Sequence, residues 1–298
     1  MDEALSKEEL RWLWEHPQER QKRHLALRQA ATTYLTDEAD STEEWALPRI
    51  AAYLQKNEAY RQRPFLLDVG CGPGYYLASI LANPAVNTAL AVGLDRNREA
   101  LLKAQARLTS WPEVELIQAD VLKLPFGPAA FGAAMCNRML NQTGDIAGTL
   151  AAVAAAISPG GLMFIITADS GEVSPLRAAH EHFQAKLGFP ERLYRHTTRP
   201  DQRFNLSNGK SWLSADYRDS RVELYERRLK FLDPAELGKY YASGLLFQKS
   251  SGLYEPEVSP SLWLELYSKV TGEMGQFIQD SGYLSYSEGA ALFSAARN

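Results

Sequence analysis

Apolar and polar residues follow a regular order between residues 65 and 167. Short apolar runs predict five buried strands, at Phe65–Val69, Ala89–Leu94, Val114–Gln118, Phe131–Cys136 and Leu162–Thr167. Residues at helical spacing separate them and predict helices over Tyr75–Leu81, Arg96–Leu108 and Asp145–Ile157. Strands that alternate with helices of this length are typical of βαβ units, which form a parallel sheet covered on both faces.

The flanking segments are less regular. Before the first strand, the spacing predicts two helical pieces separated by Pro17, the second over residues 18–34. Ser41 and Glu44 form a capping-box pattern ahead of a helix over Ala46–Gln55. After residue 169, the pattern predicts a helix over Ser174–Leu187, an irregular stretch over Phe189–Asp219, strands at Val222–Leu229, Leu245–Leu253 and Ala290–Ala296, and helices starting at Asp233 and Ser261.

These patterns predict an α/β fold with a doubly wound, mostly parallel, seven-stranded sheet and helices on both faces. We expect residues 1–62 to be N-terminal helices that pack on this core, and residues 63–170 and 222–298 to form the core itself. Residues 171–221 interrupt the alternation after the fifth strand, and we expect them to form an inserted cap over a substrate.

A glycine-rich loop follows the first strand of this core. Gly70, Gly72 and Gly74 lie between the strand and the next helix, where glycine lets a ligand approach the backbone. The loop departs from a dinucleotide fingerprint at Tyr75, and it has neither a Walker lysine nor any other Lys or Arg between Asp68 and Leu94. This composition favours a ligand that lacks phosphate and carries some positive charge.

The segment Asp68-Val-Gly-Cys-Gly-Pro-Gly74 resembles the first motif of the class I S-adenosylmethionine-dependent methyltransferases, of the small-molecule type. Further similarities follow in order at Asp95, at Gln118–Phe126, at Ser158–Gly161 and at Phe231–Leu237. The resemblance covers roughly residues 42–170 and 222–297 and does not reach the inserted segment. It implies S-adenosylmethionine as the cofactor.

The resemblance also implies a set of cofactor-binding residues: Asp68, Gly70, Cys71, Gly72, Gly74, Tyr75, Asp95, Arg96, Asp120, Val121 and Asn137. Asp95 would hold the ribose hydroxyls, and Asp120 with its neighbour would border the adenine ring. Simpler roles are open to both acids, because Asp95 can cap the helix that follows it and Asp120 can cap a turn. Tyr75 and Tyr76 follow the last glycine directly, and we expect one of them to face the cofactor.

The acceptor side of the site is less defined. The stretch Cys136–Asn141 lacks the Pro-Pro pair of enzymes that methylate nucleobase amines or amide side chains, which argues against those acceptors. We take Arg138, Asn141 and Arg177 as candidate substrate-binding residues and His180 as a candidate proton acceptor. A solvated loop position for Arg138 and a surface position for His180 remain open.

Composition restricts the remaining classes. A net charge of −4 argues against a broad nucleic-acid surface, although residues 191–230 hold ten basic and six acidic residues, a local balance of +4. Cys71 and Cys136 have no zinc-type spacing, so we expect reduced thiols and no metal. The acidic N-terminus and the absence of a long apolar run predict a cytoplasmic protein without a membrane segment.

The sequence therefore predicts methyl transfer from S-adenosylmethionine to an oxygen, nitrogen or carbon of a small molecule, which we expect to be anionic or aromatic. One alternative is a protein of the same fold that binds this cofactor and catalyses a cyclisation or elimination, or acts as a binding module. A weaker alternative is RNA methylation guided by the basic segment. The oligomeric state stays open.

Overall fold

The computed structural model describes residues 5–35, 41–167, 173–194, 203–247 and 258–298. Its contacts divide the chain into two compact units. The sheet unit comprises residues 37–171, 199–225 and 289–298. The helical unit comprises residues 1–36, 172–198 and 226–288. This grouping differs from the expected division, because residues 1–36 are assigned with two later segments rather than with the core.

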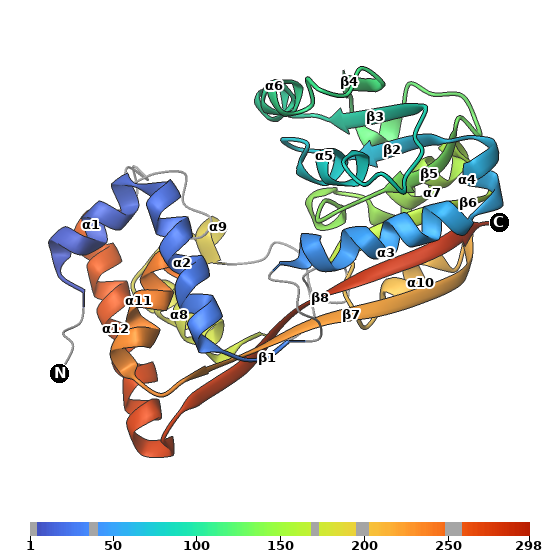
Figure 1. The fold of residues 1–298 in the computed structure, drawn as a ribbon. Coiled ribbons are helices and arrows are strands. Elements are labelled where there is room, and N and C mark those ends of the chain that lie inside the picture. Colours follow the sequence, from blue (N-terminus) through green and yellow to red (C-terminus); the bar gives the residue numbers. More distant parts are fainter. Residues whose placement is uncertain (1–4, 36–40, 168–172, 195–202, 248–257) are drawn as a thin grey trace. The chain divides into compact units, whose positions relative to one another are not determined.

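The sheet unit contains the alternating strands and helices that the apolar pattern predicts (Figure 1). In chain order its elements are α3 (Thr42–Lys56), α4 (Glu58–Gln62), β2 (Phe65–Val69), α5 (Tyr75–Leu81), β3 (Leu90–Asp95), α6 (Arg98–Arg107), β4 (Val114–Gln118), η1 (Val121–Lys123), β5 (Phe131–Met135), η2 (Leu140–Gln142), α7 (Ile146–Ala156), β6 (Ile157–Thr167) and α10 (Gly209–Leu213). Strands β7 (Tyr217–Phe231) and β8 (Leu284–Arg297) contribute residues to both units.

The sheet has eight strands in the order β1-β7-β8-β6-β5-β2-β3-β4. Strands β2 to β6 are parallel, as predicted, whereas β8 is antiparallel to β6. The prediction of seven strands is wrong, because β1 (Thr32–Leu35) adds a short antiparallel strand to β7. These residues were expected to continue a helix, but two adjacent β-branched threonines favour the extended backbone that β7 pairs with.

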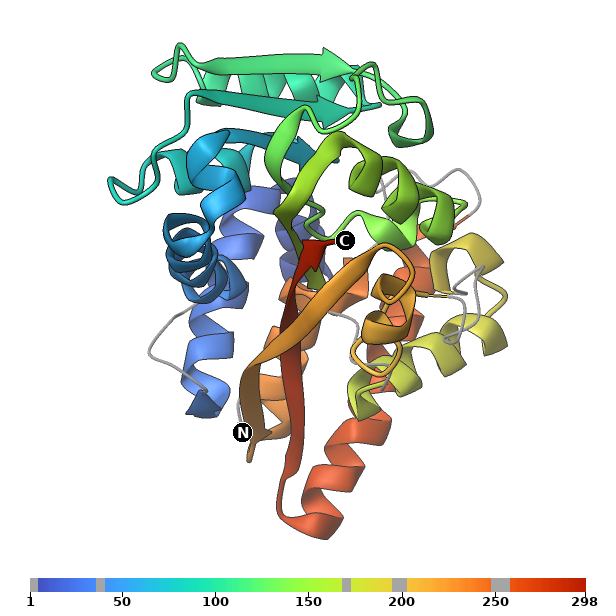
Figure 2. The same cartoon turned by 90° about the vertical axis from the view of Figure 1, so that its right-hand side faces the viewer.

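Two layers of helices cover this sheet. Helix α3 contacts α5, and α5 contacts α6, so these three helices share one layer, whereas α7 contacts α10. Figure 2 shows the blue helix α3 and the green helix α7 on opposite sides of the strands. The N-terminus of α3 begins at the predicted cap, where Ser41 Oγ accepts a hydrogen bond from the Glu44 amide at 3.1 Å. The carboxyl ends of β2, β3, β4 and β5 consequently meet at one edge, where ligands bind in sheets of this kind.

The helical unit has its own apolar core. Its elements are α1 (Lys7–Glu15), α2 (Pro17–Ala31), α8 (Pro175–Lys186), α9 (Glu191–Tyr194), α11 (Pro234–Ser243), η4 (Leu245–Phe247) and α12 (Pro260–Ser281), with β1 and parts of β7 and β8. Trp14 packs edge-on against both Phe247 and Trp263, at ring-centroid distances of 4.4 and 5.6 Å. Aromatic rings therefore join α1, η4 and α12 across this core.

Several boundaries differ from the sequence-based expectations. The strand predicted at residues 245–253 is wrong where the structure describes it, because Leu245–Phe247 form a 3-10 turn whose Leu246 and Phe247 are buried. Its remainder lies outside the described residues. The stretch expected to be irregular contains the short helices α9 and α10, which are too brief to give a periodic signal. The Ser158–Gly161 segment, expected to precede the fifth strand, lies within β6.

We predict that Gly132→Ala lowers the free energy of unfolding by about 3 kcal/mol, because it overpacks the contact between β5 and the end of α4. A Cβ at Gly132 would clash with the Arg63 carbonyl oxygen and lie 2.9 Å from Tyr60 Cα, and neither atom is the end of a flexible side chain. Chemical denaturation measures the effect. The matched control is Gly127→Ala, where no atom lies within 4 Å of the new Cβ. Equal stability of both variants would contradict the prediction.

Candidate functional site

The glycine loop connects β2 to α5 at the edge of the sheet where the parallel strands end. Gly70, Gly72 and Gly74 have φ values of 67°, 54° and 76°, a left-handed conformation that favours glycine. A Cβ at Gly70 would lie 2.7 Å from Met139 Cβ, so the loop packs closely on the segment after β5. A Cβ at Gly72 would meet no atom within 4 Å. The middle of the loop therefore borders open space in which a ligand can contact the backbone.

Asp95, at the end of β3, holds this loop in place. Its Oδ2 accepts a hydrogen bond from the Gly72 amide at 2.9 Å, and its Oδ1 accepts one from the Asn97 amide at 2.8 Å. The carboxylate thus orients the loop and the start of α6, and its oxygens have further lone pairs for a ligand's hydroxyls. Asp120 has the capping role considered above, since its Oδ1 accepts from the Leu122 amide at 3.0 Å.

Two buried polar side chains beside the loop lack protein partners. Asp68 is 1% exposed, and its Oδ2 has no hydrogen-bond partner. Burial, with a smaller contribution from the charge of Asp95, raises the pKa of Asp68 to about 8. Asn137 is 6% exposed, and neither atom of its amide has a partner. Because buried polar groups are rarely left unpaired, these atoms fit a polar ligand or water in the edge of the sheet.

The other predicted cofactor-binding residues lie around the same loop. Cys71 is buried, and burial together with the charges of Asp68 and Asp95 raises the pKa of its thiol. Tyr75 is exposed and lies under the guanidinium of Arg107, 3.6 Å from the ring centroid. Val121 is buried, whereas Arg96 is exposed at the start of the segment after β3. The structure thus brings all eleven predicted cofactor-binding residues to the ends of β2, β3, β4 and β5.

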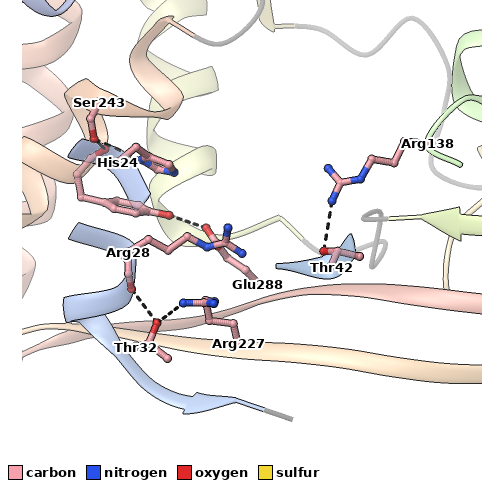
Figure 3. A network of polar contacts seen from close by, with 9 residues as sticks. His24, Arg28, Thr32, Thr42, Arg138, Arg227, Ser243 and Glu288 are labelled. Atoms are coloured by element: carbon pink, nitrogen blue, oxygen red, sulfur yellow. Dashed lines mark hydrogen bonds and ion pairs between the residues drawn. The ribbon is translucent and has the colours of Figure 1, made fainter. Parts of the chain in front are cut away.

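A polar cluster beside this loop was not predicted as a whole. It joins the first turn of α3, the first turn of α5 and the segment after β5. Arg138 Nη2 donates to Thr42 Oγ1 at 3.3 Å (Figure 3). Tyr76 Oη donates to Glu43 Oε1 at 2.7 Å, and Arg138 Nη2 lies 3.8 Å from the same Glu43 oxygen. The capping pattern at Ser41 located this turn of α3, but nothing in the sequence connects it to Arg138.

The predicted acceptor-side residues do not form one group within either unit. Asn141 is bonded to the backbone of Phe204, through its Nδ2 to the carbonyl oxygen at 2.9 Å and its Oδ1 to the amide at 2.7 Å. Arg177 and His180 belong to α8 of the helical unit. Arg177 Nη1 lies 3.6 Å from Glu181 Oε1, and His180 is 3% exposed with its Nδ1 2.7 Å from Tyr241 Oη. His180 is thus buried rather than on the surface.

The helical unit also contains a network of partly buried polar contacts. His24 Nδ1 lies 3.3 Å from Ser243 Oγ, and Arg28 Nε lies 3.1 Å from Glu288 Oε2 (Figure 3). Tyr240 Oη donates to the other oxygen of Glu288 at 2.7 Å. Burial lowers the pKa of His24. This network connects α2, α11 and β8 within the unit.

A metal site and a membrane-spanning helix are both absent from the described residues. No group of three or more His, Cys, Asp or Glu side chains there is arranged to hold a metal ion. In the same part of the chain, no helix has both the length and the apolar character needed to cross a membrane.

Comparison with known proteins identifies the segment that carries the loop. Residues 66–161 match the profile of a family described as a methyltransferase domain. The chain is 31% identical over 118 residues to the 2-phytyl-1,4-naphtoquinone methyltransferase of Thermosynechococcus vestitus. The aligned residues make up 40% of this chain and 50% of that protein. The chain is 32% identical over 120 residues to the malonyl-(acyl-carrier protein) O-methyltransferase of Erwinia billingiae, which covers 40% and 45% respectively.

The chain spans about half the length of these curated relatives. Among solved structures, the YcgJ protein of Bacillus subtilis is similar with a TM-score of 0.53 and 15% identity, over 85% of this chain and 98% of that one. A likeness at this identity concerns the fold alone. The sheet unit therefore has the α/β fold of methyltransferases, with a mixed sheet.

We predict that Asp68 makes the protein less stable as the pH rises from about 4 to about 8. The folded-state pKa of about 8 lies above the ordinary value of 3.8, so the folded protein holds a proton that the unfolded chain releases. Stability then falls with rising pH, by at most about 1.4 kcal/mol per pH unit, and levels off above pH 8. Asp68→Asn should flatten this dependence in chemical denaturation at pH 5 and pH 8. The exposed-site control Glu58→Gln should keep it, and an unchanged slope in Asp68→Asn would refute the prediction.

Proposed function

We propose that the chain is a class I S-adenosylmethionine-dependent methyltransferase that transfers a methyl group from S-adenosylmethionine to a small-molecule acceptor, because residues 66–161 match a methyltransferase-domain family. One observation carries the proposal: the matched segment contains a left-handed glycine loop beside open space, tied to a carboxylate at the end of β3. The loop sequence itself contains no lysine or arginine, whereas a phosphate-binding loop of the Walker type requires a lysine.

We assign the cofactor contacts as follows. Asp95 accepts the ribose hydroxyls with the lone pairs that its two backbone bonds leave free. Asp120 and Val121, after β4, border the adenine ring. The unpartnered Asp68 Oδ2 and Asn137 amide, beside the loop, are suited to a cofactor that carries positive charge and polar groups. Cys71, Tyr75 and Arg96 line the rest of the proposed cofactor site.

When bound, S-adenosylmethionine supplies a methyl group on a sulfonium sulfur, and the leaving group is the neutral thioether. The chain then has to align the acceptor, exclude water and, for a hydroxyl acceptor, remove a proton. We propose His180 for this last role. Its buried ring is fixed by the contact with Tyr241 Oη, which supports a defined orientation for the other ring nitrogen.

The acceptor class rests on the relatives. The two curated relatives are named as methyltransferases of a naphthoquinone and of a malonyl group on a carrier protein. Both names support an acceptor other than a nucleic acid, and the net charge of −4 agrees. We propose a small molecule that is methylated on oxygen, nitrogen or carbon, with residues 171–221 contributing to its binding. Arg177 would favour an anionic acceptor.

We predict that the protein binds both S-adenosylmethionine and S-adenosylhomocysteine in calorimetry, and that Asp95→Asn weakens the binding by about 10- to 100-fold. The loss follows from replacing one charged acceptor in contact with the ligand's hydroxyls. Asp280→Asn, at an exposed carboxylate on α12, should bind like the wild type. A folded protein that binds neither ligand would overturn the proposed function.

Methyl-labelled cofactor separates the possible reactions. We expect label in a product when the protein is incubated with naphthoquinones, malonyl thioesters and other small acids or phenols. Turnover of an acceptor without transfer of label would favour a cyclisation or elimination. Label in RNA, with binding that weakens steeply as salt is added, would favour the nucleic-acid alternative.

A further inference from the structure

Arg138 has an unusual backbone conformation directly after β5. Its φ of 56° is in the left-handed region, which is unfavourable for a residue with a Cβ. Two bonds hold it there: the Arg138 amide donates to the Ile166 carbonyl at 2.9 Å, and Gln142 Nε2 donates to the Arg138 carbonyl at 3.0 Å. Such strain persists where a side-chain position is required, and it is common at ligand sites.

The guanidinium of Arg138 contacts three polar side chains, those of Thr42, Glu43 and Tyr76. Within the described part of the chain, it bonds Thr42 Oγ1 at 3.3 Å and lies 3.8 Å from Glu43 Oε1. Glu43 Oε1 itself accepts the short bond from Tyr76 Oη. The side chain of Arg138 is 47% exposed. A guanidinium has five N–H donors in a planar fork, so a partly exposed arginine can bond an anion in addition to such neighbours.

The order of the strands places this cation relative to the cofactor site, and this step rests on the proposed function. The parallel strands lie in the order β5-β2-β3-β4, so their carboxyl ends share one edge. Asp120 and Val121, proposed to border the adenine ring, follow β4, and Asp95, proposed to hold the ribose hydroxyls, ends β3. The rest of the cofactor must then extend over β2 toward β5, where Met139 contacts Gly70 and where Arg138 lies.

We propose that Arg138 binds the α-carboxylate of the amino-acid group of S-adenosylmethionine, and that Glu43 is a counter-charge that moderates this attraction. The amino-acid group is the one anionic part of the cofactor, and a guanidinium matches a carboxylate with two parallel hydrogen bonds. The first turn of α3 is thereby part of the cofactor site. Tyr76 fixes the Glu43 carboxylate beside the guanidinium.

The test compares two ligands that differ by one carboxylate: S-adenosylmethionine and its decarboxylated analogue. Calorimetry gives the ratio of their dissociation constants for each variant. For Arg138→Gln we expect S-adenosylmethionine to bind about 10- to 100-fold more weakly while the analogue changes by less than about threefold, as expected for one charge-assisted contact. For Glu43→Gln, which keeps an oxygen for Tyr76, we expect the opposite shift, a preference for S-adenosylmethionine raised by about two- to fivefold.

The matched control is Arg61→Gln, because Arg61 is an exposed arginine of the same unit that pairs with Glu58. It should leave the ratio unchanged. Equal weakening of both ligands by Arg138→Gln would show a structural role and overturn the proposal, as would no weakening of either. A Glu43→Gln ratio that stays constant or falls would refute the counter-charge role. If the wild type binds neither ligand, the proposed function fails as well, so the two failures are distinguishable.

Discussion

The hydrogen bond from the Gly72 amide to the Asp95 carboxylate is the contact on which the candidate site depends. It ties the loop after β2 to the end of β3 at 2.9 Å. The left-handed glycines allow the loop to turn there, and the close approach of Met139 to Gly70 limits it on the side of β5. The Asp95 carboxylate thus orients the loop, and its remaining lone pairs can accept hydrogen bonds from a ligand bound beside the loop.

Charge explains why this edge suits a sulfonium rather than a phosphate. Burial raises the pKa of Asp68, and the nearby charge of Asp95 adds to this effect. A bound cation would stabilise the charged carboxylates against both burial and mutual repulsion, whereas a bound phosphate would add further repulsion. Basic side chains also lie at this edge: Arg107 lies over Tyr75, and Arg138, after β5, lies beside Glu43.

The parallel core was predictable because its signal is local. The five predicted strands of this core agree with β2 to β6 to within a few residues, since each is a continuous apolar run between turn residues. Residues 32–35 and 245–247 were not assigned correctly. The first became a strand through pairing with β7, and the second a turn through burial in the helical core, and neither partner is near in sequence.

The sequence alone determined the glycine loop, the acids that follow β3 and β4 and the kind of ligand they suit, because backbone conformation and charge at these positions depend on residue type and local spacing. Tertiary structure alone decided which side chains meet beside that loop. Glu43, Tyr76 and Arg138 come from two helices and a strand end separated by up to 95 positions, and their contacts exist only once the helices pack on the sheet. Asn141 was assigned to a substrate from its position in a motif, yet it bonds a backbone segment 63 residues away. Spacing reveals a motif, but long-range contacts depend on packing.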